Sequence, residues 1–425
     1  MHKDDSPMFP PREDPLPGNG ARMSRRGFLE FTGSAALAAT GLALAPGRVF
    51  PAENAKKIRI GVVGGNFGTQ WYWHEHPNCV VTGVTDLRPD RRERLVKTYG
   101  CKTVYDSLET MVKQARDIDA VAVFSGAPDH AKHVEMCMAR GWHVISAVPA
   151  CMSLEEAQRM VEAKKRSGMS YMMAETSWYR QGVIYARNLY KAGGFGEMYY
   201  SEVEYYHDLG DMQRYVDDKT TRMYEPDGSR SWRWGLPPML YPTHSTGCLL
   251  GVSDERITKV SCLGWRGDSA AYREHPCRDN VYNNPFYSAA SMMLTDRGHM
   301  CRCNVFWRLV GHGERAQWFG DRASLYMPLD GVHGAVEAIR TQGHRKLDVP
   351  RYWKTAEMLP PAMRHDTGHD GSHVFLAAEF INALVDEREP EINLERALAM
   401  TVPGIVAHES ALRDGEQLEV PRFEA

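Results

Sequence analysis

A glycine-rich turn near residue 64 has the residue types of a phosphate-binding loop. The run GVVGGNFG places Gly64, Gly65 and Gly68 after a short apolar segment. Such a turn between a strand and a helix lets backbone N–H groups approach a pyrophosphate. Asn66 stands where G-x-G-x-x-G would have its second glycine, and the loop is one residue short. A plain strand-to-helix turn is the alternative, but Asp86, after the next β-rich run, favours a dinucleotide site.

The acidic residue at the end of the second expected strand also bears on the choice of cofactor. An acid at this position binds a ribose hydroxyl, so Asp86 favours NAD over NADP. Arg88, two residues further along the chain, leaves NADP as an alternative cofactor. His130 either faces the ligand or caps a chain turn. The expected cofactor contacts are Gly64, Gly65, Asn66, Phe67, Gly68, Asp86, Ser125, His130 and Pro149.

The stretch WHVISAVPAC has the form of an active-site corner, with a buried strand, then Pro149, then a helix. A strand end of this kind is where an α/β enzyme normally places a charged catalytic group. The two residues before the proline are Ala147 and Val148, and neither can carry a proton. If this corner belongs to an active site, the proton chemistry must come from elsewhere.

Metal and disulfide chemistry are not expected. The tripeptide HEH at residues 74–76 precedes Pro77 and is more typical of a chain turn than of a metal site, so no metal is predicted. The nine cysteines are scattered, and the sequence has no C-x-x-C pair. Isolated buried thiols are therefore expected rather than a disulfide framework.

The order of elements that must position these residues indicates two domains. From residue 56 to 178, short apolar strands alternate with helices, which predicts a doubly wound parallel sheet of the α/β class. A helix-compatible stretch follows the glycine turn. From 179 to 425 the β-rich runs lack interleaved helices and predict an open antiparallel sheet, with loop-like regions at 209–240 and 345–372. Two helices close the chain, and Pro403 predicts a kink or break in the second.

The first 55 residues are predicted to be a leader rather than part of the fold. Arg25 and Arg26 precede a weakly apolar, Ala/Gly-rich segment, residues 32–45, which is too short for a stable membrane span. This pattern is typical of a twin-arginine export signal and predicts a periplasmic protein. A disordered basic leader is the alternative. The net charge of −3 gives no indication of nucleic-acid binding, and no membrane association is expected after cleavage.

The glycine turn, Asp86 and the motifs SGAPDH, GWHVISAVP, KAGGFGEM, WFGDRASLYM and TVPGIVAHESALRDGE together resemble the Gfo/Idh/MocA family. The resemblance runs from about residue 57 to the C-terminus. It implies an N-terminal Rossmann domain, a C-terminal α+β domain with an open antiparallel sheet, NAD(P) as cofactor and a homo-oligomer acting on small carbohydrates or cyclitols. That family usually has Glu-Lys-Pro where this chain has Ala147, Val148 and Pro149.

Four motifs are similar to the NAD-dependent glycosidases of glycoside hydrolase family 109: MMAETSWY, YYHDL, LYPTH and TGHDGSH. Those enzymes also have Val-Pro in place of Lys-Pro, but they usually keep the Glu that is Ala147 here. The resemblance implies transient oxidation of a sugar 3-hydroxyl by bound NAD⁺. The proton on C2 then becomes acidic, the C1 group leaves, water adds, and the same cofactor restores the hydroxyl.

The same motif positions imply a set of catalytic residues, namely Tyr205, His207, Tyr241 and His244. Tyrosine and histidine suit proton transfer near neutral pH if their neighbours tune the pKa. The expected roles place His244 at the hydroxyl being oxidised, with Tyr205 or Tyr241 as the base. Tyr241 and His244 would share a face if they start a helix. Without the resemblance, each would more simply be a core, surface or capping residue.

The remaining candidates concern the substrate. Arg233 would hold a substrate oxygen, Asp370 and His373 would close the pocket, and Tyr287 is a further candidate contact. Three functions stay open: an oxidoreductase that transfers hydride at a carbohydrate ring hydroxyl, a glycosidase with no net redox change, and a non-catalytic sugar- or nucleotide-binding protein.

Overall fold

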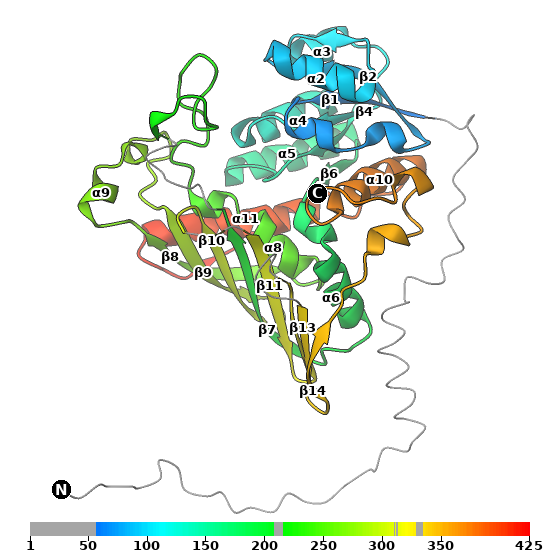
Figure 1. The fold of residues 1–425 in the computed structure, drawn as a ribbon. Coiled ribbons are helices and arrows are strands. Elements are labelled where there is room, and N and C mark those ends of the chain that lie inside the picture. The colour runs from blue at the N-terminus through cyan, green and yellow to red at the C-terminus, as the bar shows by residue number, and fades with distance from the viewer. Residues whose placement is uncertain (1–56, 208–215, 310, 312, 329–334) are drawn as a thin grey trace, which may run out of the picture.

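The computed structural model describes residues 57–207, 216–309, 311, 313–328 and 335–425. The predicted leader, residues 1–55, lies outside the described residues, as does 208–215 within the first predicted loop region. The described chain forms two sheets with their own helices, as predicted (Figure 1).

The first sheet has six parallel strands in the order β3-β2-β1-β4-β5-β6, which is the doubly wound arrangement. Because the chain winds in opposite directions from β1 and β4, the carboxyl ends of these neighbours border the crevice where such sheets bind ligands. The strands are β1 (Ile58–Val63), β2 (Cys79–Thr85), β3 (Val104–Tyr105), β4 (Ala120–Val123), β5 (His143–Ser146) and β6 (Tyr171–Met173). The helices are α2 (Pro89–Tyr99), α3 (Leu108–Gln114), α4 (His130–Ala139) and α5 (Leu154–Ser167).

The helix predicted after the glycine turn is wrong. Two 3-10 turns stand there instead, η1 (Phe67–Gln70) and η2 (Trp73–Glu75). Trp71 and Trp73 are completely buried, and the Trp71 ring stacks on Phe124 with centroids 4.7 Å apart. Burial of these large indoles outweighs helix propensity in so short a segment. The glycine turn is therefore not followed by the N-terminus of a long helix.

The second sheet has nine strands in the order β14-β13-β12-β11-β7-β10-β9-β8-β15. Its pairs are antiparallel except for β7 and β10, which run parallel, so the predicted open antiparallel sheet is largely correct. The strands are β7 (Met198–Tyr206), β8 (Ile257–Trp265), β9 (Ser288–Thr295), β10 (Met300–Phe306), β11 (Gly313–Gly320), β12 (Ala323–Tyr326), β13 (Ala335–Ile339), β14 (Gly343–Leu347) and β15 (Leu418–Glu419).

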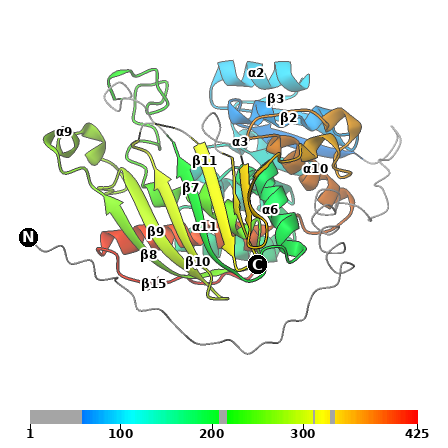
Figure 2. The same cartoon turned by 60° about the horizontal axis from the view of Figure 1, so that its bottom comes forward.

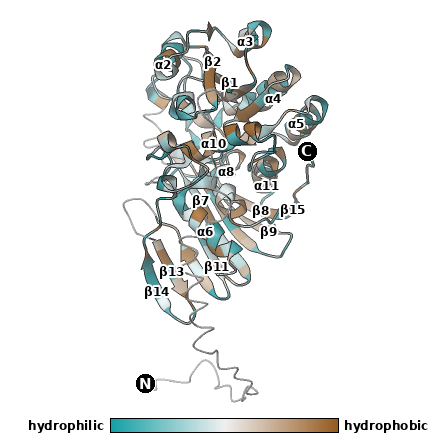
Figure 3. Ribbon diagram, turned by 90° about the vertical axis from the view of Figure 1, so that its right-hand side faces the viewer, coloured by the Kyte–Doolittle hydropathy of each residue, from teal (hydrophilic) through white to brown (hydrophobic). Residues whose placement is uncertain are grey.

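Part of this sheet contradicts the predicted loops. β14 begins just before, and runs into, the region 345–372, and its residues Gly343–Leu347 pair with β13. In Figure 3, β14 is hydrophilic, in contrast to β1, and four of its five residues are exposed. An exposed edge strand carries no apolar alternation, so the hydrophobic pattern could not reveal it.

The helices of the second part connect it to the first sheet. In Figure 2 the strands of the large sheet lie in front of α11, which contacts β8 and also β6 and α5. Of the predicted kink or break in this helix, the break is wrong, because α11 runs through Pro403 without interruption. At the next position, a Cβ on Gly404 would lie 2.2 Å from the Met239 carbonyl oxygen, so α11 passes very close to η5 (Pro238–Leu240). The helices are α6 (Gln181–Lys191), α8 (Thr243–Leu250), α9 (Ala270–Arg273), α10 (Ser372–Val385) and α11 (Leu394–Leu412).

The cysteine prediction is confirmed: all nine thiols are free and buried. Within the described ranges, no helix combines the length and apolar character that a membrane span requires.

Candidate functional site

The corner after β5 is apolar and is held by backbone contacts. The Ala147 amide donates to the Val123 carbonyl at 2.9 Å, and Val148 is 7% exposed. His130 is buried beside it, with Nδ1 2.7 Å from the Pro149 carbonyl oxygen and Nε2 3.1 Å from that of Ser125. Burial lowers the pKa of His130. The imidazole therefore ties the corner to the end of β4 and faces carbonyl groups on both sides.

The glycine turn is shaped by close backbone approaches. Gly64 has a φ of +99°, and a Cβ there would lie 2.3 Å from the Phe124 carbonyl oxygen. A Cβ on Gly65 would lie 2.1 Å from the Arg91 carbonyl oxygen. Only glycine fits either position without moving the backbone. The glycines thus bring the turn against β4 and α2.

Asp86 braces this turn from the end of β2. Its Oδ2 accepts the Gly65 amide at 2.7 Å, and its Oδ1 accepts the Arg88 amide at 2.8 Å. Each carboxylate oxygen can still accept a further hydrogen bond, which suits the hydroxyls of a ribose. Because η1 is short, a pyrophosphate would be held by amides of the turn itself, at Asn66 and Phe67, rather than by a helix N-terminus. With this adjustment the residues fit a dinucleotide.

The four predicted catalytic residues come together. Tyr205 and His207 lie at the end of β7, and their ring centroids are 5.7 Å apart. The His244 ring, at the start of α8, lies 4.6 Å from Tyr205 and 5.5 Å from Tyr241. Tyr241 precedes the helix instead of sharing its first turn, yet the two rings still meet. The indole of Trp307 packs edge-on against Tyr205 and Tyr241.

Two carboxylates that the sequence analysis missed complete this cluster. Glu175, just after β6, is completely buried, and its Oε1 lies 2.9 Å from His244 Nδ1. Glu314 of β11 has Oε1 4.0 Å from the same nitrogen. Its other oxygen accepts from the Ser177 hydroxyl and is paired with Arg180. Glu175 stands inside the motif MMAETSWY, and a charged residue just past an apolar strand was the available signal.

The carboxylates decide the protonation of His244. Burial alone would lower its pKa, but the negative charges of Glu175 and Glu314 outweigh burial and raise it. Burial likewise opposes the charged form of Glu175, and the attraction of His244 outweighs it and lowers the carboxyl pKa. Each partner therefore favours the charged form of the other, the imidazolium of His244 and the carboxylate of Glu175.

Burial raises the pKa of both tyrosines, Tyr205 strongly. Both are neutral phenols at neutral pH and suit hydrogen-bond donation better than proton abstraction.

Arg233 lies beside the cluster around His244. Its guanidinium stacks on Trp232 at 4.1 Å, and its positive charge acts to lower the pKa of Tyr241. A Cβ on Gly126 would lie 2.8 Å from the Trp232 ring, so this loop reaches the end of β4 in the first sheet. The position suits the predicted contact to a substrate oxygen.

The other substrate candidates are placed differently. Tyr287 belongs to a separate apolar cluster with Trp234, and its hydroxyl donates to the Tyr272 carbonyl at 3.1 Å. Asp370 accepts the Gln181 amide at the start of α6 through Oδ2 at 3.0 Å. His373 is completely buried. His373 is therefore enclosed, whereas Asp370 holds the start of α6 with one oxygen and pairs with Arg351 through the other, partly exposed to solvent.

His369, another residue that was missed, links the glycine turn to the catalytic cluster. Its ring centroid lies 6.1 Å from Phe67 of the glycine turn and 6.5 Å from His244. The motif TGHDGSH contains two histidines four residues apart, and the prediction selected only the second, His373. This contact chain places the expected nucleotide corner and the acid–base cluster side by side.

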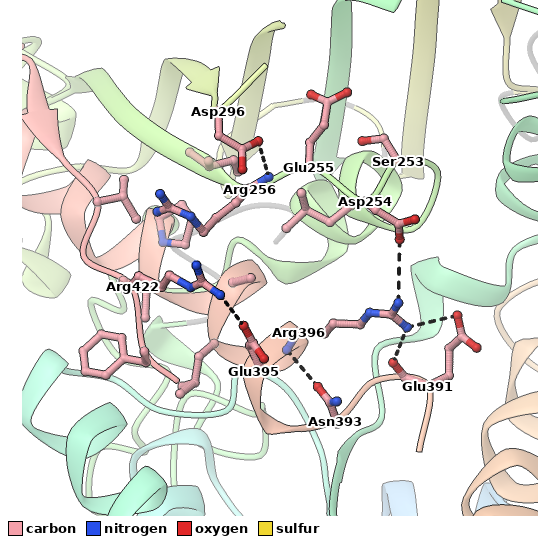
Figure 4. Close-up of a pocket in the computed structure, with 18 of the residues that line it drawn as sticks. Ser253, Asp254, Glu255, Arg256, Asp296, Glu391, Asn393, Glu395, Arg396 and Arg422 are labelled. Atoms are coloured by element: carbon pink, nitrogen blue, oxygen red, sulfur yellow. Dashed lines mark hydrogen bonds and ion pairs between the residues drawn. The ribbon is translucent and has the colours of Figure 1, made fainter. Parts of the chain in front are cut away.

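A cavity of about 670 Å³ lies elsewhere, between the loop at 253–257, the start of α11 and the tail at 420–423 (Figure 4). Its walls are crossed by ion pairs, including Arg396 with Asp254 at 3.6 Å. It contains none of the predicted site residues. In the described part of the chain, no group of three or more His, Cys, Asp or Glu residues is placed to bind a metal. Within HEH, His76 faces Asn382 and Glu75 pairs with His365.

Comparison with known proteins supports the assignment of the first sheet as a nucleotide-binding domain. Residues 58–175 match the model of the oxidoreductase family with an NAD-binding Rossmann fold, GFO_IDH_MocA. A glycosyl hydrolase family 109 protein of Streptomyces coelicolor is 24% identical over 86% of this chain and 83% of its own length. One from Shewanella amazonensis is 26% identical over 53% of this chain, and the match spans 54% of that relative.

Among solved structures, a levoglucosan dehydrogenase in complex with NADH and levoglucosan has a TM-score of 0.70 at 15% identity. The alignment covers 87% of this chain and all of the dehydrogenase. At this identity the likeness establishes the fold, which is the same pair of a Rossmann domain and a second sheet domain.

Proposed function

We propose that the chain, whose residues 58–175 match the model of the Gfo/Idh/MocA oxidoreductase family, is an NAD-dependent enzyme that oxidises a ring hydroxyl of a small carbohydrate. The observation that carries this proposal is the contact chain from Phe67 through His369 to His244. It joins the nucleotide corner to a buried acid–base cluster. Bound NAD⁺ supplies the hydride acceptor; the rest of the chemistry belongs to the side chains.

The cluster offers distinct roles for its members. His244 is fixed through Nδ1 by Glu175, which favours its protonated form, and in that form it presents Nε2–H as a donor to a substrate oxygen. A cation at this place stabilises the negative charge that develops when a hydroxyl loses its proton. The Tyr205 and Tyr241 phenols add neutral donors, and Arg233 holds a further oxygen. Trp307 excludes water from one side.

The second candidate is a glycosidase with no net redox change. The relatives named glycosyl hydrolase family 109 favour it, as does Val148 in place of the lysine of ordinary dehydrogenases. In this reaction the same cluster would first remove the hydroxyl proton and later return it. The oxidised sugar would lose its C1 group between these two steps.

One pair of assays separates the functions. The purified protein is incubated with aryl glycosides without added NAD⁺, and phenol release is followed; NADH absorbance is then followed with free sugars. NADH accumulation supports the dehydrogenase, and phenol release without it supports the glycosidase. If both assays are silent but sugars still shift the melting temperature, the protein is a binder. Absorbance and mass spectra of the purified protein test for copurified NAD(H).

Two further proposals concern location and assembly. The paired Arg25 and Arg26 support export in a folded, cofactor-loaded state, and replacing both with lysine should retain the protein in the cytoplasm. A homo-oligomer is supported by one face of the large sheet. The register of β8, β9 and β10 puts four exposed apolar residues on that face: Leu263, Trp265, Met292 and Met300. Light scattering would measure the assembly state.

A further inference from the structure

The turn that carries His369 has an unusual backbone. His369, Asp370 and Gly371 have consecutive φ values of 56°, 57° and 81°, in the left-handed region that disfavours side chains. Neighbours hold this conformation: Asp370 accepts the Gln181 amide, and a Cβ on Gly371 would lie 2.5 Å from the Trp353 ring. Backbone held in this region by its surroundings is concentrated at functional sites.

A hydrogen-bond chain fixes the proton on His369. The Gln70 carbonyl can only accept, so His373 Nδ1, 3.1 Å away, must donate to it. In a neutral imidazole the other nitrogen is then an acceptor, so His373 Nε2 accepts from His369 Nδ1 at 2.9 Å. It follows that the neutral His369 carries its proton on Nδ1 and a lone pair on Nε2.

The surroundings keep both rings neutral. Burial lowers the pKa of His369 to about 4 and that of His373 to about 3. The charged groups that face His369 are Glu314 and Glu175, which raise its pKa, and Arg180 and His244, which lower it. Among the described residues, no hydrogen-bond partner is found for Nε2.

The surroundings therefore shift the pKa values of the two cluster histidines in opposite directions although their rings are neighbours. The rings of His369 and His244 are 6.5 Å apart and nearly parallel, with an interplanar angle of 17°. The carboxylates of Glu175 and Glu314 favour the imidazolium of His244, while the hydrogen-bond chain through His373 leaves the Nε2 lone pair of His369 as a base. Two titratable groups whose environments separate their pKa values are the mark of an acid–base pair.

We propose that His369 is the general base of the reaction, with Nε2 receiving the substrate hydroxyl proton and His373 positioning the ring; this rests on the proposed function. The O–H bond breaks and an N–H bond forms on Nε2. With NAD⁺ bound as the hydride acceptor, the hydrogen on the carbon that bears this hydroxyl would leave as hydride, so the alcohol would become a carbonyl and the electrons would balance. The Glu314 carboxylate stabilises the new imidazolium. The assignment serves the glycosidase equally, because that reaction begins with the same step.

The first test reads the tautomer without any turnover. In protein labelled with ¹⁵N-histidine, long-range ¹H–¹⁵N spectra at pH 7 should show His369 and His373 as neutral rings protonated on Nδ1. Comparison with the spectra of His369→Asn and His373→Asn assigns the signals. An imidazolium at His369, or a proton on its Nε2, overturns the proposal.

The second test measures the base directly. His369→Asn keeps an amide donor toward His373, and asparagine tolerates the left-handed backbone, so the turn should fold. Loss of a general base should lower kcat by about 10²- to 10⁴-fold, with NAD⁺ affinity in calorimetry unchanged. The matched control is His365→Asn, in the same loop but paired with Glu75.

The outcomes separate the two proposals. Wild-type activity together with near-wild-type kcat in His369→Asn overturns the base assignment and leaves the proposed function standing. A wild-type protein that binds NAD⁺ but turns over neither free sugars nor aryl glycosides overturns both.

Discussion

β5 and β6 are neighbours in the parallel sheet and end at the same edge, yet their ends differ in chemistry. Beyond β5 come Ala147, whose amide donates to the Val123 carbonyl, and the buried Val148. Beyond β6 comes Glu175, a buried carboxylate that fixes His244. These two residues beyond β5 carry no side chain that can transfer a proton. The side chains that can do so follow the end of the neighbouring strand, β6. An apolar corner is therefore no evidence against catalysis when the neighbouring strand end is charged.

The two regions should also respond differently to substitution. The β5 corner consists of neutral contacts, so small apolar changes there remove packing alone. The β6 end is a set of buried charges that neutralise one another. Removal of one member leaves an uncompensated charge, which typically costs about 3–5 kcal/mol of folding free energy. Variants at the β6 end therefore need substitutions that keep the hydrogen bonds.

The largest effect is expected from His244→Asn. The asparagine amide can still donate to Glu175, but Nε2 and its positive charge are lost, so kcat should fall by about 10³-fold or more. Cofactor affinity, measured by calorimetry, should not change. At the other strand end, Val148→Ala should change kcat by less than about threefold. Turnover that survives in His244→Asn would make this histidine structural.

Val148→Lys gives the β5 corner a charged side chain, at the position where ordinary dehydrogenases of this type have a lysine. Val148 is buried, and within the described residues no carboxylate is hydrogen-bonded to the corner, so the ammonium group should cost about 2–4 kcal/mol of unfolding free energy. Urea denaturation measures the loss. Dehydrogenase turnover should not rise. A rise would mean that the corner still aligns a lysine with the substrate.

The neutralising variant Glu175→Gln should change the pH profile of kcat. Because Glu175 helps raise the pKa of His244, wild-type activity persists below that raised pKa and is lost as pH rises through it. Without the carboxylate charge the alkaline limb should move down by about one pH unit or more. Glu255→Gln is the matched control, since Glu255 pairs with His299 at 3.1 Å outside the cluster. An unmoved limb would show that His244 does not set it.

The sequence predicted the fold and the grouping of residues around His244 for different reasons. Strand and helix periodicity identified both sheets, and the motif positions identified Tyr205, Tyr241 and His244, whose rings do meet. Glu314 escaped because β11 mixes charged, glycine and aromatic residues and does not look like a buried strand.

His369 escaped for another reason, since its role comes from tertiary hydrogen bonds and a left-handed backbone. No spacing along the chain records either feature. The two-histidine pattern of TGHDGSH could have drawn attention to it, but not to which ring carries the lone pair.

The smallest effect is expected at the nucleotide corner, from Arg88→Ala. The Arg88 guanidinium pairs with Asp90, and both side chains are well exposed to solvent, so the pair adds little order to the turn. Asp86 reaches the turn independently, through the Gly65 amide. The affinity for NAD⁺ should therefore change by less than about threefold. If instead NADP⁺ affinity is substantial and falls by about tenfold or more in this variant, Arg88 holds a 2′-phosphate. The cofactor would then be NADP, and the acid at Asp86 would serve the turn alone.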